Sequence, residues 1–171
     1  FGIEMQKAGY KTGMVGKWGV GGPTTESTPW TMGFDFYYGC ICQRMAHNYY
    51  APYIWKNDKK EWINQKVLNP GTGLDKGADP LDIRSYDKYS KGKVYSPDVM
   101  FDNVIKFVGD NKTKPFFLMW TTPLPHSPLQ APQKYVDHYV KKFGDEAPLA
   151  GDKFRLNEWP HNYYPCRYPH A

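Results

Sequence analysis

Two side chains in this sequence could act on an anion. Lys17 lies in a glycine-rich turn, residues 16–22, where an ammonium group and backbone N–H groups can face the same anion. His126 lies between Pro125 and Pro128, which restrict the backbone around it. An imidazole can donate to an anion or protonate a leaving group. Together these residues indicate binding of an oxyanion, or chemistry on one.

A third segment, CQRMAHNYY at residues 42–50, mixes polar donors with aromatic rings. This combination would suit a sugar or an oxyanion, and its candidate binding residues are Gln43, Arg44 and His47. Each candidate also has an ordinary explanation. Lys17 could be a surface lysine, His126 a structural loop histidine, and residues 42–50 a surface loop. The glycine-rich turn fits neither the P-loop order GxxxxGK[ST] nor a dinucleotide-binding GxGxxG turn.

Composition argues against several other classes of protein. The net charge is +5, but the basic residues are scattered, so a solvated surface explains them and no nucleic-acid partner is expected. No segment approaches the roughly 18 apolar residues of a membrane span, so no membrane partner is expected. The three cysteines, Cys40, Cys42 and Cys166, fit neither a disulfide framework nor a zinc site. We expect them to be packing thiols.

The elements that position Lys17 and His126 are those of an α/β protein. Residues 11–15 predict a short strand that ends just before the glycine-rich turn. Residues 116–120 form an apolar run that is typical of a strand buried on both faces of a parallel sheet. Loops at the ends of such strands are where α/β proteins bind ligands. We therefore expect a mainly parallel central sheet flanked by helices, with many loops.

Further elements follow from pattern and turn chemistry. The sequence predicts a helix end at residues 1–8, a strand-like segment at 34–38, a hairpin of 53–55 and 61–63 around a polar turn, and a short helix at 133–140. Residues 68–93 read as a long surface excursion. A longer helix starts at Ser96 as its cap, with Pro97 and Asp98 in its first turn, and ends within 109–114. The apolar stripe of this helix is Phe101, Val104, Ile105 and Val108.

Three motifs together resemble the formylglycine-dependent sulfatase (arylsulfatase) family. KAGYKTGMVGKW at residues 7–18 is similar to the family motif AGY-T…GKW, and GFDFYYG at 33–39 is similar to GFD-F-G. PFFL at 115–118, followed by PHSPLQAP at 125–132, resembles PFFL…PH-P…P. The order and spacing match, and the variants at 16–21 and 42–50 are most similar to bacterial members.

The resemblance implies a partial alkaline-phosphatase-like α/β fold and hydrolysis of aryl or carbohydrate sulfates. In that family a formylglycine attacks sulfur and a calcium ion binds the sulfate oxygens. Lys17 is then expected to contact the formylglycine and the sulfate, and His126 to bind the sulfate or the leaving-group oxygen. Gln43 falls where relatives place a sulfate-contacting side chain. A bacterial enzyme of this kind would be periplasmic or secreted.

The sequence departs from the family at two points. Many relatives have histidine two residues after the lysine, as in GKWHLG, whereas this chain has Gly19. Our hypothesis is that His47 compensates. The C/S-x-P-x-R motif that matures to formylglycine is also missing. We therefore expect the formylglycine, the calcium ion and its ligands to lie outside the segment, and residues 1–171 to be part of the N-terminal catalytic domain of a longer enzyme, cut at both ends.

Two alternatives stay open. A phosphatase or phosphodiesterase of the same superfold would have an upstream Ser or Thr nucleophile and two metal ions. A non-catalytic module would bind an anion or a glycan without turnover. The aromatic residues Tyr49, Tyr50, Tyr53 and Trp55 fit a sugar-stacking surface, although a packed core cluster explains them equally well.

Overall fold

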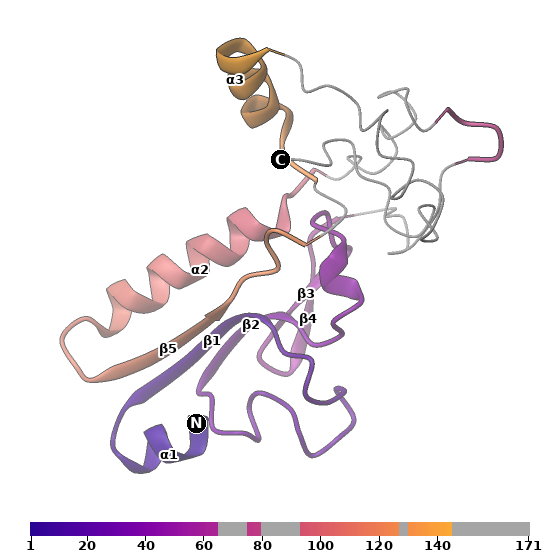
Figure 1. The fold of residues 1–171 in the computed structure, drawn as a ribbon. Helices are drawn as coiled ribbons and strands as arrows, with labels where there is room; N and C mark the ends of the chain where they lie inside the picture. Colours follow the sequence, from indigo (N-terminus) through magenta and orange to yellow (C-terminus); the bar gives the residue numbers. More distant parts are fainter. Residues whose placement is uncertain (65–74, 80–92, 127–129, 145–171) are drawn as a thin grey trace.

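A computed structural model describes residues 1–64, 75–79, 93–126 and 130–144 of the chain. Its centre is a five-stranded sheet with the strand order β4-β3-β2-β1-β5 (Figure 1). The strands are β1 Lys11–Lys17, β2 Phe36–Cys40, β3 Tyr53–Lys56, β4 Lys59–Trp62 and β5 Phe116–Thr121. The helices are α1 Gly2–Lys7, α2 Ser96–Asn111 and α3 Gln133–Phe143, and a 3₁₀ turn, η1, lies at Met45–His47.

The sheet is mixed. β1 pairs in parallel with both β2 and β5, whereas β2–β3 and β3–β4 are antiparallel pairs. The α/β class is therefore confirmed, while the expected predominance of parallel pairing holds only for the β2-β1-β5 part. The predicted hairpin is β3–β4, and Asn57 in its turn has a φ of 51°, a conformation that asparagine tolerates well. Predicted features at 68–74, 80–92 and beyond 144 lie outside the described residues.

Apolar side chains from the central strands fill both faces of the sheet. Successive strand residues point to opposite faces, so Val15 and Tyr38 enter one cluster while Met14 and Tyr37 enter the other. α2 covers the first face and contributes Met100 and Val104 to it. The segments that lead to Lys17 are thus held by buried side chains on both sides.

The face that α2 buries differs from the predicted stripe. Of the four predicted residues only Val104 is buried, while Phe101 and Ile105 are 46% and 56% exposed. The buried residues are Ser96, Pro97, Met100, Val104 and Phe107. One further detail differs: Ser96 lies inside the helix, where its hydroxyl accepts a hydrogen bond from the Ala51 N–H at 3.0 Å. The helix ends at Asn111, within the predicted range.

β5 was predicted to be buried on both faces, and this is wrong for the described part of the chain. There β5 is the edge strand next to β1, its residues are half-buried, and Trp120 is 47% exposed. The Trp120 ring lies 5.7 Å from that of Phe101, so α2 and β5 share an apolar border (Figure 1).

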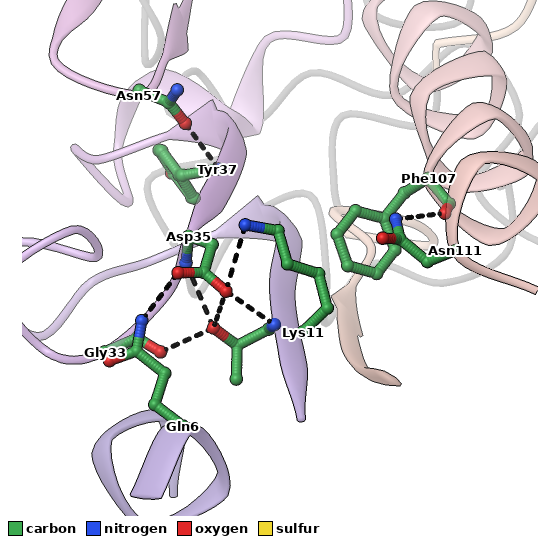
Figure 2. A network of polar contacts seen from close by, with 9 residues as sticks. Gln6, Lys11, Gly33, Asp35, Tyr37, Asn57, Phe107 and Asn111 are labelled. Atoms are coloured by element: carbon green, nitrogen blue, oxygen red, sulfur yellow. Dashed lines mark hydrogen bonds and ion pairs between the residues drawn. The ribbon is translucent and has the colours of Figure 1, made fainter. Parts of the chain in front are cut away.

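A polar network fixes the start of β1 (Figure 2). The Asp35 carboxylate accepts hydrogen bonds from the Thr12 N–H at 3.0 Å and from the Gln6 amide at 2.8 Å, and it pairs with the Lys11 ammonium at 3.3 Å. Burial acts to raise the pKa of Asp35, but these donors outweigh it and the pKa lies below its usual value. Asp35 of the GFD motif thus joins α1 and β1 to the segment that leads into β2. This network lies at the start of β1, the end of the strand opposite Lys17.

Candidate functional site

The candidate residues lie where three strands end. Because β1 is parallel to both of its neighbours, β1, β2 and β5 all finish at the same edge of the sheet. β1 ends on Lys17, β2 ends at Cys40 before the loop that contains η1, and β5 ends at Thr121 before His126. This is the edge at which open α/β sheets bind ligands.

The backbone at Lys17 is held from both sides. The Thr121 hydroxyl of β5 donates to the Lys17 carbonyl at 2.6 Å, and the Tyr37 hydroxyl of β2 donates to the Gly16 carbonyl at 3.1 Å. The Lys17 side chain is half-buried, and burial lowers the pKa of its ammonium. β5 and β2 therefore fix the backbone position from which the Lys17 side chain extends.

Close contact between the strands at Gly16 leads to our first prediction. Gly16 has a φ of +116°, and a Cβ there would lie 2.0 Å from the Thr121 carbonyl oxygen. Gly16→Ala is expected to lower the free energy of unfolding by at least ~1–3 kcal/mol, because neither backbone can yield.

Gly109→Ala is the matched control for Gly16→Ala. Gly109 lies in α2 with open space around its Cβ position, so alanine there should raise stability by about 0.5–1 kcal/mol. Denaturant unfolding of both variants measures the difference. A Gly16→Ala protein as stable as the parent would contradict the packing described here.

His47 and His126 lie against one another. Their ring centroids are 3.9 Å apart and the ring planes differ by 9°, although the residues come from different loops. His47 is the last residue of η1, and His126 lies in a turn closed by its own N–H, which donates to the Pro123 carbonyl at 3.1 Å. The structure thus brings these two predicted residues together.

Burial lowers the pKa of His47 to about 4, and the positive charges of His126, Lys17 and Arg44 add to this. Lys17 and Arg44 therefore lie near enough to His47 for their charges to disfavour a further charge on it. His47 and His126 are in contact beyond the carboxyl edge of the sheet, and the positive charges of Lys17 and Arg44 act on this place. Such a place attracts an anion, and at neutral pH His47 is an uncharged member of it.

The low pKa of His47 makes the fold sensitive to acid. Its usual value is 6.5, so between about pH 4 and 6.5 the unfolded chain binds more protons at this residue than the folded chain does. Its contribution to stability is therefore complete above pH 6.5 and is lost as the pH falls towards 4.

We expect an NMR titration to give His47 a midpoint near 4. We also expect His47→Gln to reduce the loss of unfolding free energy between pH 6.5 and 4. A midpoint near 6.5 in the parent protein would contradict the crowding of positive charge around His47.

Gln43 lies over Gly19. The glycine has a φ of +73°, and a Cβ on it would lie 2.3 Å from Oε1 of Gln43. The Gln43 side chain therefore occupies the space that a side chain at position 19 would need. Gln43 therefore lies beside the turn that follows Lys17.

The described residues offer no other chemistry of this kind. Cys40 is buried and burial raises the pKa of its thiol to about 12, whereas Cys42 is exposed, and both are free thiols. Within residues 1–64, 75–79, 93–126 and 130–144, no three His, Cys, Asp or Glu side chains gather as a metal site would require. None of the described helices is long and apolar enough to span a bilayer.

The aromatic group divides into two parts. Tyr49 and Tyr50 are 1% and 7% exposed, so they belong to the core and offer no stacking surface for a sugar. Tyr53 and Trp55 are half-buried, and the Lys60 ammonium lies over both rings, 4.6 and 5.4 Å from their centroids. The rings therefore give little reason to prefer a carbohydrate.

The sequence did not reveal the residues whose side chains fix the backbone around Lys17 and His126, namely Thr121, Tyr37 and Tyr49. Each acts through a side-chain hydroxyl on a backbone carbonyl. A tyrosine or threonine in an apolar segment looks like any core residue until the fold brings a carbonyl to it. Only the position of Thr121, directly after the apolar run 116–120, could have drawn attention.

Comparisons with known proteins agree on one family. The Sulfatase profile matches residues 4–166. Arylsulfatase J of Mus musculus is 32% identical over 138 residues, and an uncharacterized sulfatase of Schizosaccharomyces pombe is 27% identical over 153. These matches take in 80% and 89% of this chain but only 20% and 25% of those proteins. Because these relatives are a mammalian and a fungal protein, the bacterial type stays a prediction.

A solved structure, the PsFucS1 sulfatase from Pseudoalteromonas sp., is also similar to this chain. It has a TM-score of 0.44 and 20% identity over 75% of this chain and 27% of that one. The profile match alone covers well over half of the 171 residues. The chain therefore belongs to the sulfatase family.

Proposed function

We propose that this chain forms part of a sulfuric ester hydrolase and supplies its sulfate-binding cations. The contact between His47 and His126 beyond the carboxyl edge of the sheet, on which the charges of Lys17 and Arg44 act, carries this proposal. A sulfate ester is an anion, and its transfer to a nucleophile concentrates charge on the sulfuryl oxygens and on the leaving oxygen. Fixed cations and donors stabilise that charge.

Each residue has a distinct role in this proposal. The Lys17 ammonium faces the sulfuryl oxygens, and its partly buried setting strengthens the interaction because little water screens it. His126 donates to the leaving oxygen as the bond to sulfur breaks. Arg44 and Gln43 contact the sulfate or the group attached to it. His47 is neutral and stacks on His126, where it takes the place of the family histidine missing at Gly19.

We propose that the nucleophile and the metal ion come from a part of the protein outside these 171 residues. A formylglycine would be the nucleophile in this proposal, and a calcium ion would neutralise negative charge on the sulfate when bound. No C/S-x-P-x-R motif occurs in the 171 residues, and the described residues form no metal site. The steps assigned to this chain are therefore binding, charge stabilisation and proton donation.

The test is hydrolysis by the complete gene product that contains this sequence. We expect it to release sulfate from an aryl sulfate at least about a hundred times faster than phosphate from the matched aryl phosphate, and we expect the 171-residue chain alone to release neither. A preference for the phosphate would favour a phosphatase or phosphodiesterase. Binding of a sulfated sugar by the complete protein without any turnover would favour a non-catalytic module.

A further inference from the structure

The segment that carries His126 is fastened to Tyr49. The Tyr49 hydroxyl donates to the Pro123 carbonyl at 3.3 Å and also to the His126 carbonyl. Its backbone N–H donates to Oε1 of the Gln130 side chain at 2.6 Å. Tyr49 is thus hydrogen-bonded to Pro123, to His126 itself and to Gln130, which lie before, at and after the candidate histidine.

Tyr49 is itself rigidly placed. Its side chain is only 1% exposed, and its ring meets that of Tyr95 edge to face at 6.0 Å and 84°. Tyr95 supports the same arrangement, because its hydroxyl donates to the Gln130 carbonyl at 2.9 Å. A buried phenol that caps two carbonyl oxygens of one turn leaves that turn little freedom.

The same short stretch of chain also touches the imidazole. His47, two residues before Tyr49, stacks on the His126 ring at 3.9 Å. The backbone of His126 is therefore held by Tyr49 while the face of its ring is held by His47. Loops at active sites work when a rigid scaffold positions them, and this contact pair supplies such a scaffold.

We infer that Tyr49 is a positioning residue for His126. It acts through the backbone carbonyls of Pro123 and His126 and touches no reacting atom. The inference rests on the proposed function, since it takes His126 to donate to the leaving oxygen. Small displacements of a catalytic group cost up to about a hundredfold in rate, so we expect Tyr49→Phe to lower kcat by roughly ten- to a hundredfold.

The experiment uses the complete gene product and two aryl sulfates, one with a good and one with a poor leaving group. Tyr49→Phe keeps the ring and removes only the hydroxyl. We expect kcat to fall at least tenfold more for the poor leaving group, because that substrate depends more on proton donation. KM should change less than threefold. A merely structural defect would reduce the amount of active enzyme and lower both rates equally, and that result would contradict the inference.

Tyr50→Phe is the matched control. Tyr50 is the next residue, it is also buried, and its hydroxyl bonds to none of the described residues. Its variant should retain kcat within about twofold for both substrates. If Tyr50→Phe showed the same leaving-group pattern as Tyr49→Phe, the effect would not belong to the Tyr49 hydroxyl.

A double variant separates this inference from the function it rests on. In the His126→Ala background, Tyr49→Phe should cause no further loss of kcat, because the group that it positions is gone. If His126→Ala alone leaves turnover unchanged, the proposed function fails. If His126→Ala lowers turnover but Tyr49→Phe does not, or lowers it equally in both backgrounds, only the positioning role fails.

A second variant covers the case in which Tyr49→Phe does not fold. Tyr95→Phe releases the Gln130 end of the same segment and leaves Tyr49 intact. We expect a smaller loss with the same preference for the poor leaving group. Equal losses for both substrates in this variant would contradict the positioning role.

Discussion

Lys17→Ala is expected to lower kcat/KM for an aryl sulfate by about 10²- to 10³-fold in the complete gene product, the usual cost of removing one donor from a site that stabilises transition-state charge. The physical reason is that the Lys17 side chain is half-buried and its backbone carbonyl is held by the Thr121 hydroxyl, so its ammonium is a preorganised donor that water replaces poorly. Steady-state kinetics of the purified variant measures the loss.

Two further variants sharpen the test of Lys17. Lys17→Arg keeps the charge but replaces a compact ammonium with a larger planar fork, so we expect it to recover only a small part of the activity. Lys106→Ala removes one exposed lysine that pairs with Asp110 on α2, and it should leave kcat/KM within about twofold. A Lys17→Ala enzyme with near-normal kcat/KM would remove this residue from the mechanism.

The second large effect is expected at His126. His126→Ala should lower kcat by about 10²-fold or more for an aryl sulfate with a poor leaving group, the usual range for loss of a general acid. The loss should shrink to a few fold for a good leaving group, which departs without a proton. Rates across a series of aryl sulfates measure this as a steeper dependence on the pKa of the leaving phenol. An equal loss along the whole series would assign His126 to sulfate binding instead.

Local patterns in the sequence predicted most of the elements correctly. The polar residues between Trp55 and Glu61 predicted a hairpin, and β3 and β4 form one. The Ser-Pro-Asp sequence at residues 96–98 predicted the start of α2 to within one residue, because Ser96, expected as the cap, is the first helical residue and Tyr95 is the cap. Such signals work because a turn or a helix start depends mainly on the residues within it.

Features that depend on neighbours could not be read in this way. The α2 sequence offers two apolar sets at helical spacing. One set is Phe101, Ile105 and Val108, and the other is Met100, Val104 and Phe107. Packing chose the second set because it faces the sheet. The apolar run of β5 likewise could not reveal that, in the described structure, the strand has a neighbour on one side only.

The sequence allowed one feature of the candidate site to be predicted, namely that two of its residues follow neighbouring strands. Lys17 and His126 follow two strands that proved to be parallel neighbours, and the carboxyl ends of such strands meet at one edge. The stacking of His47 on His126 has no such rule behind it, because it depends on the path of the loop that contains η1. The hydroxyl contacts of Thr121 and Tyr49 depend on carbonyls more than 70 residues away in sequence.

A crystal structure of the complete gene product with bound sulfate would test the assembled site most directly. We predict one sulfate ion whose oxygens lie within about 2.7–3.2 Å of both Lys17 Nζ and a ring nitrogen of His126. A sulfate held by only one of these side chains, or seated away from the carboxyl edge of the sheet, would contradict the account.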